Sequence, residues 1–417
     1  MAKKKAAKMN RLDILMAAKK AHQYEVGAGG SLMDPMMSSV RGIRLPSLGL
    51  MDMLGLSALR DSCTVLIDGE PGSSKSSLAI EFFNWGLPYG AGGAILDCEN
   101  KGAFDVAYGM LNPVTLWTGH LVMQTCLTVE STQSSIKGVV SAARDTNKDL
   151  DRDDQIPFII VTDPLAGAAS EETRKSIAKE GSADRGHGGR LEALLWSIFL
   201  KDHEADIVNL PVISVFVNHT KKTTEQRGSR AVAKDYNPGG VAQNYATTIQ
   251  INCRCFKRYV SESVTGISYE DIGLKCKKNS RGPTGRMTTV RKCSRRNEDG
   301  TTTFWWDWGL NTGEFILNLA RGHPALDIVQ ITKKSDSKFD CKAVGLKEAT
   351  LSEIGDAVMK DDTLLDELIK ACRVFKLREF QSISPEEYET LLANAEEAEK
   401  AYRKSLVVGQ SGGSDVQ

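Results

Sequence analysis

One short segment of the chain combines glycines, hydroxyl side chains and a lysine in an order that could bind phosphate. An apolar run precedes it and a helical pattern follows it. At such a junction, backbone N–H groups and the helix N-terminus can surround an anion. Lys75 would reach the β- and γ-phosphates of a nucleotide, and the Ser76 hydroxyl would bind Mg²⁺. The predicted phosphate-binding residues are Gly69, Glu70, Pro71, Gly72, Ser73, Ser74, Lys75, Ser76 and Ser77.

The residue before the lysine departs from the usual pattern of such a P-loop. That position is usually glycine, and here it is Ser74. Serine can replace glycine there if the position does not require a positive φ. The motif alone could also be a chance Gly/Ser loop, so its place between a strand and a helix carries part of the interpretation.

Polar side chains also follow three later apolar strands. Asp163 follows residues 158–162 and is a candidate Walker B carboxylate that would hold Mg²⁺. Glu99 ends an earlier strand and could orient and deprotonate an attacking water. His219 follows residues 212–217 and could sense the terminal phosphate. Because the carboxyl ends of parallel strands meet at one edge of a sheet, all three can face the P-loop. The alternatives are an ordinary surface aspartate and a histidine satisfied at the edge of the core.

The elements that must position these residues alternate between apolar strands and helices. Buried strands flanked by helices predict an α/β fold with a mostly parallel sheet and helices on both faces. From residue 247 the pattern changes to strands and hairpins, and after residue 325 it is helical, with capping-box spacing at Thr350 and Ser384. The expected strands are 64–68, 94–97, 158–162 and 212–217, and the expected helices are 76–85, 134–146 and 191–201.

The composition excludes several classes of protein. The 417 residues are 41% hydrophobic and 25% charged, which is ordinary for a globular protein and excludes a disordered, collagen-like or disulfide-scaffold chain. No apolar run approaches the ~20 residues of a membrane helix, and no signal core follows the basic N-terminus. We therefore expect a cytoplasmic protein without membrane contact, whose nine cysteines are reduced core residues.

The net charge of zero hides an uneven distribution of charge. Residues 1–20 hold seven Lys or Arg against one Asp, and residues 275–296 hold nine Lys or Arg and no acid. Residues 345–417 hold nine basic and fifteen acidic residues. Local basic density attracts phosphate, so the two basic segments are candidate sites for a polyanion. The alternative is that each is an ordinary solvated face.

Taken in order, these motifs resemble the core of RecA-family recombinases, and most closely the phage UvsX-like branch. The P-loop of that branch also replaces the last glycine and keeps Lys-Ser. Residues 97–99 resemble the catalytic glutamate segment of the family, and residues 217–220 match the Asn-His-Thr run before its second DNA-binding loop. The similarity covers roughly residues 40 to 320. It implies a RecA-like P-loop ATPase core that binds ATP and Mg²⁺, with Asp105 and Tyr108 at the adenine.

The resemblance also implies two DNA-binding loops, from Ala168 to Gly189 and from Lys221 to Gly240. Independently of family, the second segment is polar, basic and long for a connection inside a compact domain. An exposed surface loop without DNA is the alternative. Basic side chains on such loops would contact DNA phosphates without regard to sequence. The implied contacts are Arg174, Lys175, Lys179 and Arg185 in the first loop and Lys221, Lys222, Arg227, Arg230 and Lys234 in the second.

The basic run from Lys275 to Arg281 resembles the family segment that reaches into the ATP site of a neighbouring subunit. Lys278 and Arg281 are the candidate trans-acting cations, a role worth ~10³–10⁵ in rate in other NTPases. A contact to duplex DNA is the alternative. The aromatic residues 304–308 could stack on bases, but a core-closing edge strand or a subunit contact is the favoured interpretation.

These inferences divide the chain into three parts. A basic helical segment for oligomerisation spans 1–40, a RecA-like ATPase core with DNA-binding loops spans 41–324, and an acidic helical region with a disordered tail spans 325–417. The resemblance implies a DNA-dependent ATPase that forms helical filaments on single-stranded DNA and exchanges strands with duplex DNA in recombination and repair. A phage origin would place it in the host cytoplasm, with single-strand-binding or mediator proteins as candidate partners. The alternatives are a hexameric replicative helicase of the same fold and a nonenzymatic recombination mediator.

Overall fold

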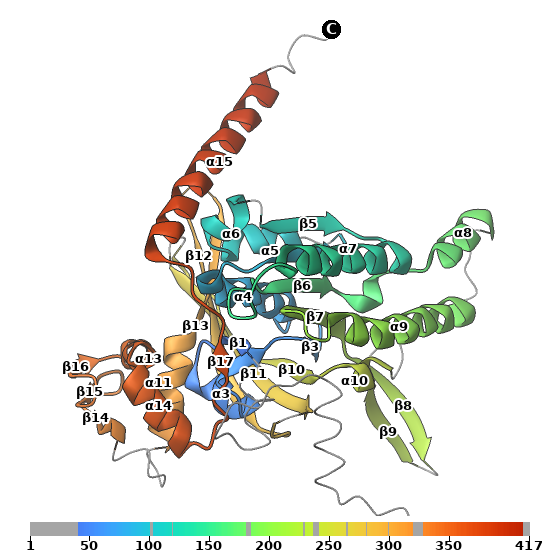
Figure 1. Cartoon of the computed structure of the whole chain (residues 1–417). Coiled ribbons are helices and arrows are strands. Elements are labelled where there is room, and N and C mark those ends of the chain that lie inside the picture. Colours follow the sequence, from blue (N-terminus) through green and yellow to red (C-terminus); the bar gives the residue numbers. More distant parts are fainter. Residues whose placement is uncertain are drawn as a thin grey trace, which may run out of the picture.

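A nine-stranded sheet forms the centre of the molecule, with the strand order β13-β12-β11-β10-β3-β7-β6-β4-β5 (Figure 1). The computed structural model describes residues 41–100, 103–118, 120–180, 185–227, 230–236, 242–263, 266–280, 282–298, 300–319 and 328–411. The strands from β10 to β5 in that order run parallel. The pairings among β10, β11, β12 and β13 are antiparallel. The predicted α/β fold with a mostly parallel sheet is therefore confirmed.

The strands of this sheet include all four that the sequence predicts before residue 218. The parallel strands are β3 (Cys63–Gly69), β4 (Gly92–Asp97), β5 (Leu121–Thr125), β6 (Phe158–Asp163), β7 (Val212–His219) and β10 (Ile249–Tyr259). The antiparallel strands are β11 (Ile267–Asn279), β12 (Met287–Arg296) and β13 (Thr302–Asp307). Phe304, Trp305 and Trp306 thus lie on an edge strand with Trp306 buried, as predicted, whereas Trp308 begins helix α11 (Trp308–Leu319).

Helices cover both faces of the sheet. Alternate residues of a strand point to opposite faces, and in this sheet both sets are apolar and must be buried. Val65 and Ile67 of β3 lie in one apolar core, and Leu66 between them lies in a second core on the other side. The covering helices are α4 (Lys75–Gly86) and α5 (Ala103–Met110) on the first face and α7 (Val129–Asn147) and α9 (Arg185–Ile207) on the second.

Helix α7 begins at Val129 rather than at the predicted residue 134. The Thr128 side chain accepts the N–H of Ser131, and the Ser131 hydroxyl accepts the N–H of Thr128. This is a reciprocal capping box in which serine takes the place of the usual glutamate or glutamine. The sequence rule looks for the longer side chain and therefore missed this helix start.

The C-terminal region is only partly helical, which corrects the prediction of a helical region after residue 325. A separate antiparallel sheet of three strands lies in it, and strands of three or four residues are too short to show a period of two. The predicted capping box at Thr350 is present. The elements are α11 (Trp308–Leu319), β14 (Ile331–Lys333), β15 (Phe339–Cys341), β16 (Leu346–Ala349), α13 (Leu351–Lys360), α14 (Asp362–Ala371), β17 (Arg378–Glu379) and α15 (Pro385–Ser411).

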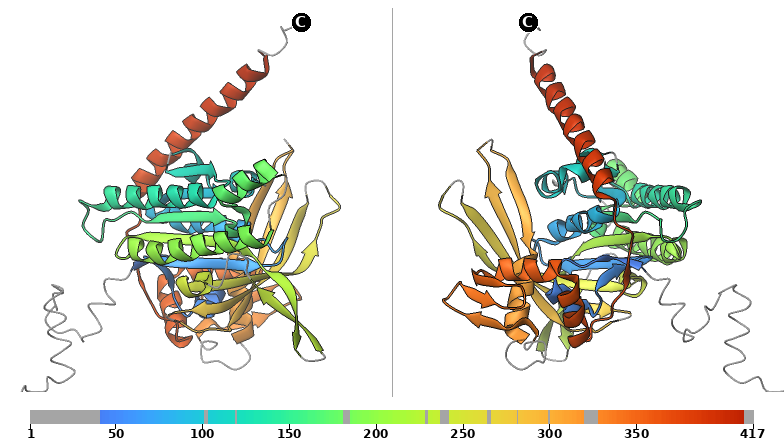
Figure 2. Two further views of the ribbon diagram at one scale, coloured as in Figure 1. Left: turned by 90° about the vertical axis from the view of Figure 1, so that its right-hand side faces the viewer. Right: turned by 60° about the vertical axis from the view of Figure 1, so that its left-hand side comes forward.

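The C-terminal region is joined to the beginning of the core by strand pairing. Strand β17 pairs in parallel with β1, which also pairs with β2. Helix α15 then projects from the body, as does the β8–β9 hairpin (Figure 2). The remaining elements are β1 (Arg41–Arg44), α3 (Leu48–Leu54), β2 (Ala58–Arg60), η1 (Leu87–Tyr89), α6 (Pro113–Trp117), η2 (Leu165–Gly167), α8 (Glu171–Glu180), β8 (Lys221–Arg227), β9 (Arg230–Tyr236) and α10 (Ala242–Ala246).

Two predictions concern the ends of the chain. The basic helix predicted within 1–40 lies outside the described residues. Helix α15 extends to Ser411, so the predicted tail cannot begin at Gly409, and residues 412–417 lie outside the description.

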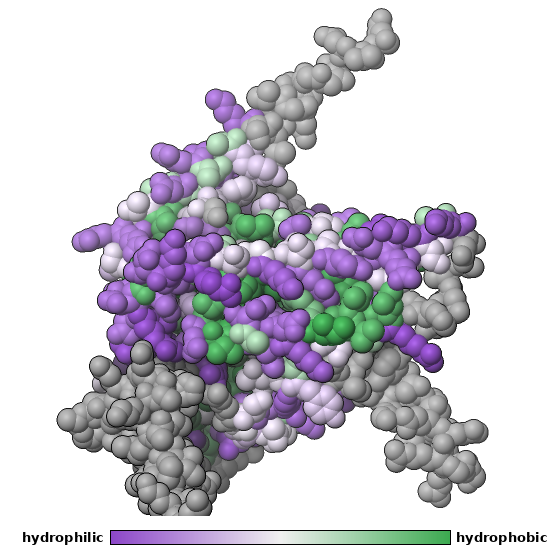
Figure 3. Space-filling view, turned by 45° about the vertical axis from the view of Figure 1, so that its right-hand side comes forward, coloured by the Kyte–Doolittle hydropathy of each residue, from purple (hydrophilic) through white to green (hydrophobic). Residues whose placement is uncertain are grey.

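The surface over α9 is unusually apolar. Hydrophobic residues gather there in Figure 3, and Leu194 and Ile198 are more than half exposed while Trp196 of the same helix is buried. No helix in the described part of the chain combines the length and the apolar character needed to cross a membrane. All nine cysteines fall within the described ranges and are free thiols, and eight of them are buried as predicted, whereas Cys255 is only partly buried.

Candidate functional site

The predicted P-loop connects β3 directly to the first residue of α4, which is Lys75. Gly72 has φ 72°, which favours glycine. At Gly69 a Cβ atom would lie 2.2 Å from the carbonyl oxygen of Cys253 on β10, so only glycine fits. The loop is therefore built as its sequence predicts, at a helix N-terminus that can accept an anion.

Serine was expected to replace glycine at position 74 only if the position does not require a positive φ, and the structure does not meet this condition. Ser74 has φ 59° and ψ 27°, which is the left-handed region. For an L-residue this conformation costs roughly 1–2 kcal/mol. The Ser74 hydroxyl makes no capping bond to α4 and instead donates to Oε2 of Glu270 on β11 at 2.7 Å. The position does require positive φ, and this chain meets the requirement without glycine.

Lys75 is buried and folded onto its own loop. Its Nζ donates to the carbonyl oxygen of Glu70 at 2.7 Å and lies 3.4 Å from Oγ of Ser73. Burial lowers the pKa of Lys75, and nearby acidic groups that include Asp163 oppose that shift. An anion in the loop would offer this ammonium a partner of full charge in place of a carbonyl.

Asp163 lies beside the P-loop, as predicted, and receives a hydrogen bond from Ser76. The pKa of this carboxyl is raised to about 6. Burial is the main cause and Asp97 and Glu99 add to it, whereas Ser76 and Lys75 act against the shift. A buried carboxyl among acidic neighbours gains from a bound cation. Oxygen donors from one carboxylate and one hydroxyl suit Mg²⁺, which takes its other ligands from waters and substrate phosphates. Ser76 and Asp163 therefore fit the predicted Mg²⁺ site.

The register of the parallel strands brings the candidate residues to one edge. Asp97 at the end of β4 is opposite Asp163 at the end of β6, and His219 at the end of β7 is opposite Gly69 at the end of β3. Strand β7 lies between the P-loop strand and the Walker B strand. The side chains that follow these ends consequently face a common space.

Glu99 is positioned by a turn that the sequence reading did not assign. Oδ1 of Asp97 accepts the backbone N–H groups of Glu99 at 3.0 Å and of Asn100 at 2.7 Å. Oε1 of Glu99 lies 3.7 Å from Nε2 of His219. The two side chains come from strands on opposite sides of β6, and the Asp-x-Glu spacing was the available signal for the role of Asp97.

A further buried acid, Asp68, directly precedes Gly69, the first residue of the P-loop. It lies in β3 with a fully buried side chain, and its oxygens accept from Gln250 and Asn252 on β10. The Nζ of Lys277 on β11 is 3.1 Å from Oδ1 of Asp68. An acid inside an apolar strand signals a buried polar network, but only the tertiary structure identifies its partners.

Of the two candidate trans-acting cations, the structure describes Lys278 but not Arg281. Lys278 on β11 donates from Nζ to the carbonyl oxygens of Asn244 at 2.8 Å and Tyr245 at 2.9 Å, at the end of α10. It is therefore engaged within its own chain, where a lysine stabilises a helix C-terminus. Arg281 lies outside the described residues.

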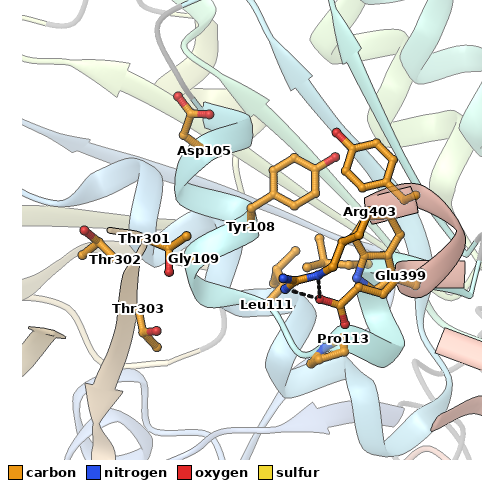
Figure 4. A pocket seen from close by; sticks show the side chains of 13 residues that line it. Asp105, Tyr108, Gly109, Leu111, Pro113, Thr301, Thr302, Thr303, Glu399 and Arg403 are labelled. Carbon is orange, nitrogen blue, oxygen red and sulfur yellow. Dashed lines mark hydrogen bonds and ion pairs between the residues drawn. The ribbon is translucent and has the colours of Figure 1, made fainter. Parts of the chain in front are cut away.

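The two predicted adenine contacts, Asp105 and Tyr108, line one cavity of about 600 Å³ (Figure 4). Trp117 of α6 lies with its ring 6.1 Å from Tyr108 and 5.1 Å from Tyr402 of α15. Helix α15 also supplies Glu399 to the lining. The sequence reading missed this wall, because nothing in an acidic C-terminal helix indicates that it packs against α6.

The cavity lies on the same face of the sheet as the P-loop helix. Asn84 of α4 donates to the carbonyl oxygen of Met110 of α5 at 3.1 Å. Because α5 follows Glu99 and packs beside α4, the cavity and the P-loop are on one side of the sheet.

The described residues of the two segments predicted as DNA-binding loops lie mostly in regular elements, which corrects that part of the prediction. In the first, Arg174, Lys175 and Lys179 lie on helix α8, and Arg185 begins α9. The second forms the β8–β9 hairpin, with seven cross-strand residue pairs. The polar, basic composition of this segment predicts a loop, whereas its described residues form two paired strands. The hairpin strands carry Lys221, Lys222, Arg227, Arg230 and Lys234.

The comparisons with known proteins add no relative. No protein-family model matches the chain, and no curated protein is similar to it in sequence. The chemistry of the site is therefore argued from its own residues.

Proposed function

We propose that this protein is an Mg²⁺-dependent ATPase of the RecA type that assembles on single-stranded DNA and promotes homologous pairing and strand exchange. One observation carries the ATPase proposal: Lys75, Ser76, Asp163, Glu99 and His219 converge at one edge of the sheet. The residues come from four strand ends, and each has a chemical type that phosphoryl transfer uses.

The P-loop and the start of α4 bind the phosphates of ATP. Backbone N–H groups of the loop contact phosphate oxygens, and Lys75 exchanges the Glu70 carbonyl, 2.7 Å away, for the β- and γ-phosphates. Ser76 and Asp163 would hold Mg²⁺, which would neutralise charge on the phosphates. The base lies in the cavity beside Asp105 and Tyr108.

Glu99 acts as the general base. The turn made by Asp97 holds the Glu99 backbone, so the carboxylate can orient a water toward the γ-phosphorus. The water oxygen bonds to phosphorus, the bond to the bridging oxygen of ADP breaks, and Glu99 takes the proton. His219, 3.7 Å from Glu99, couples the state of this site to the segment that follows β7.

The β8–β9 hairpin follows His219 directly and carries five of the basic residues predicted to contact DNA. A projecting basic hairpin can contact the phosphate backbone without reading sequence. In this proposal ATP binding orders the hairpin on DNA and hydrolysis releases it. Arg281 supplies the cation to the ATP site of the next subunit.

Electron microscopy with single-stranded DNA, Mg²⁺ and a slowly hydrolysed ATP analogue tests the proposal. The expected result is continuous helical filaments that form only when nucleotide is present. Closed rings would instead indicate a replicative helicase. ATP binding without any assembly on DNA would indicate a recombination mediator. Lys75→Ala protein, prepared in the same way, is the control that links assembly to the P-loop.

The trans-acting role of Arg281 has a separate test. Arg281→Ala and Lys75→Ala proteins are each expected to hydrolyse ATP poorly. A mixture should recover part of the activity, because a subunit with intact Lys75 can receive Arg281 from a neighbour that lacks Lys75. If the mixture assembles and recovers nothing, Arg281 does not act across the interface.

A further inference from the structure

The left-handed serine of the P-loop contacts a pair of charged residues, Arg258 on β10 and Glu270 on β11. Ser74 donates to Oε2 of Glu270 at 2.7 Å, and Nε of Arg258 donates to Oε1 of the same carboxylate at 2.6 Å. The Nη2 of Arg258 also donates to the carbonyl oxygen of Gly72 at 3.2 Å. The pair therefore contacts the loop at two positions, on both sides of Ser73.

These contacts oppose the cost of the backbone conformation at Ser74. Hydrogen bonds to a charged group are stronger than those between neutral groups. The Glu270 side chain is only 23% exposed, so water competes weakly for its oxygens. Arg258 uses one carboxylate oxygen and leaves the other for Ser74. The hydrogen bond from the Ser74 hydroxyl to Glu270 therefore favours the left-handed backbone conformation in which the two groups meet.

We propose that Glu270, oriented by Arg258, is a positioning residue that holds Ser74 in the left-handed conformation and so pre-shapes the P-loop for phosphate. The inference rests on the proposed nucleotide site and adds a residue to it. It accounts for how this loop works with serine where glycine is usual. It also assigns a role in phosphate binding to the antiparallel strands, which lie outside the strand ends that carry the chemistry.

A double-mutant cycle tests this inference. The affinity for a fluorescent ATP analogue with Mg²⁺ is measured for the unaltered protein, Ser74→Gly, Glu270→Ala and the double variant. Glu270→Ala should weaken binding about tenfold when residue 74 is serine. The loss should be under about twofold when residue 74 is glycine, which needs no anchor. Glu262→Ala, an exposed glutamate at the end of the same hairpin, should change nothing.

Equal losses in the serine and glycine backgrounds would overturn the proposal, since Glu270 would then act on binding by another route. No loss in either background would overturn it as well. Glu270→Gln, which keeps an acceptor for Ser74 but loses the charge pair with Arg258, should lie between the two extremes. A merely structural role for Glu270 would not depend on whether residue 74 is serine or glycine.

Urea unfolding of the same four proteins without nucleotide separates this inference from the proposed function. Glu270→Ala should lower the unfolding midpoint in the serine background and leave it nearly unchanged in the glycine background. If none of the four proteins binds nucleotide but this difference appears, the ATP site is wrong and the anchoring of Ser74 stands. Equal shifts in both backgrounds would remove the anchoring role, whatever the nucleotide result.

Discussion

The acidic side chains of the large sheet have different partners in its parallel half and in its antiparallel half. At the parallel edge Asp163 is buried with a raised pKa, close to Asp97 and Glu99. In the antiparallel half, Glu270 and Asp271 are each paired with an arginine at 2.6 and 2.7 Å. The three acids at the parallel edge would gain from a bound cation, whereas Glu270 and Asp271 each have an arginine partner within the chain. Buried charge without a full partner is typical of a functional site, and paired charge is typical of its support.

The largest effect is expected at the parallel edge. Lys75→Ala should abolish ATP binding or turnover, because the ammonium that meets the β- and γ-phosphates is lost. The fold should remain, since burial of the charged group already lowers the pKa of Lys75. Equilibrium nucleotide binding, ATPase rate and thermal unfolding provide the measurements. Lys137→Ala, an exposed lysine on α7, is the matched control, and unchanged ATPase activity in Lys75→Ala would refute the P-loop assignment.

A smaller loss should separate chemistry from binding. Glu99→Gln should reduce the turnover rate by about 10²–10³ while nucleotide affinity stays near normal, because the amide cannot take a proton from water. Glu270→Ala should show the opposite division, with weaker affinity and little change in turnover at saturation. Steady-state kinetics measure the turnover rate of each variant, and binding titrations measure its nucleotide affinity. If both variants lose affinity alone, the two halves do not differ in function.

Asp163 predicts a pH dependence of stability. Its folded pKa of about 6 exceeds the ordinary value of 3.8, so the folded state binds the proton more tightly than the unfolded state. The free energy of unfolding should therefore fall as pH rises from about 4 to about 6, by up to about 3 kcal/mol. Asp163→Asn should remove this fall. Urea denaturation across this pH range, without Mg²⁺, measures the effect, and identical curves for both proteins would contradict it.

Mg²⁺ should offset the loss of stability that ionisation of Asp163 causes. At pH 7 the cation should raise the unfolding midpoint of the unaltered protein and leave that of Asp163→Asn unchanged, because binding to the folded state alone stabilises it. A rise of equal size in both proteins would place the cation away from Asp163.

The smallest expected effect concerns Lys278 at the antiparallel side. Lys278→Met should lower the free energy of unfolding by about 1 kcal/mol, because two carbonyl oxygens at the end of α10 lose their donor. The ATPase rate per bound nucleotide should not change. Normal stability combined with a rate loss that mixing restores would instead return Lys278 to the trans-acting role.

The halves also differ in how well the sequence predicted them. The residues at the parallel strand ends were found in advance, because a polar residue after a buried apolar run is a local pattern and parallel strands align their carboxyl ends. The interaction of Glu270 with Ser74 was not found, because it depends on the register of β10 with β11 and of β10 with β3. The α8 helix was interpreted as a loop because a polar, basic segment has no apolar period to reveal it.

The sequence by itself determined the four apolar strands before residue 218, the P-loop glycines and the residue types at those strand ends. These depend on local patterning and on conformations that few residues tolerate. The tertiary structure decided that Ser74 is left-handed and anchored, that Lys278 closes α10, and that α15 forms a wall of the cavity beside Tyr108. Each of these joins residues far apart along the chain, and such contacts arise from how elements pack.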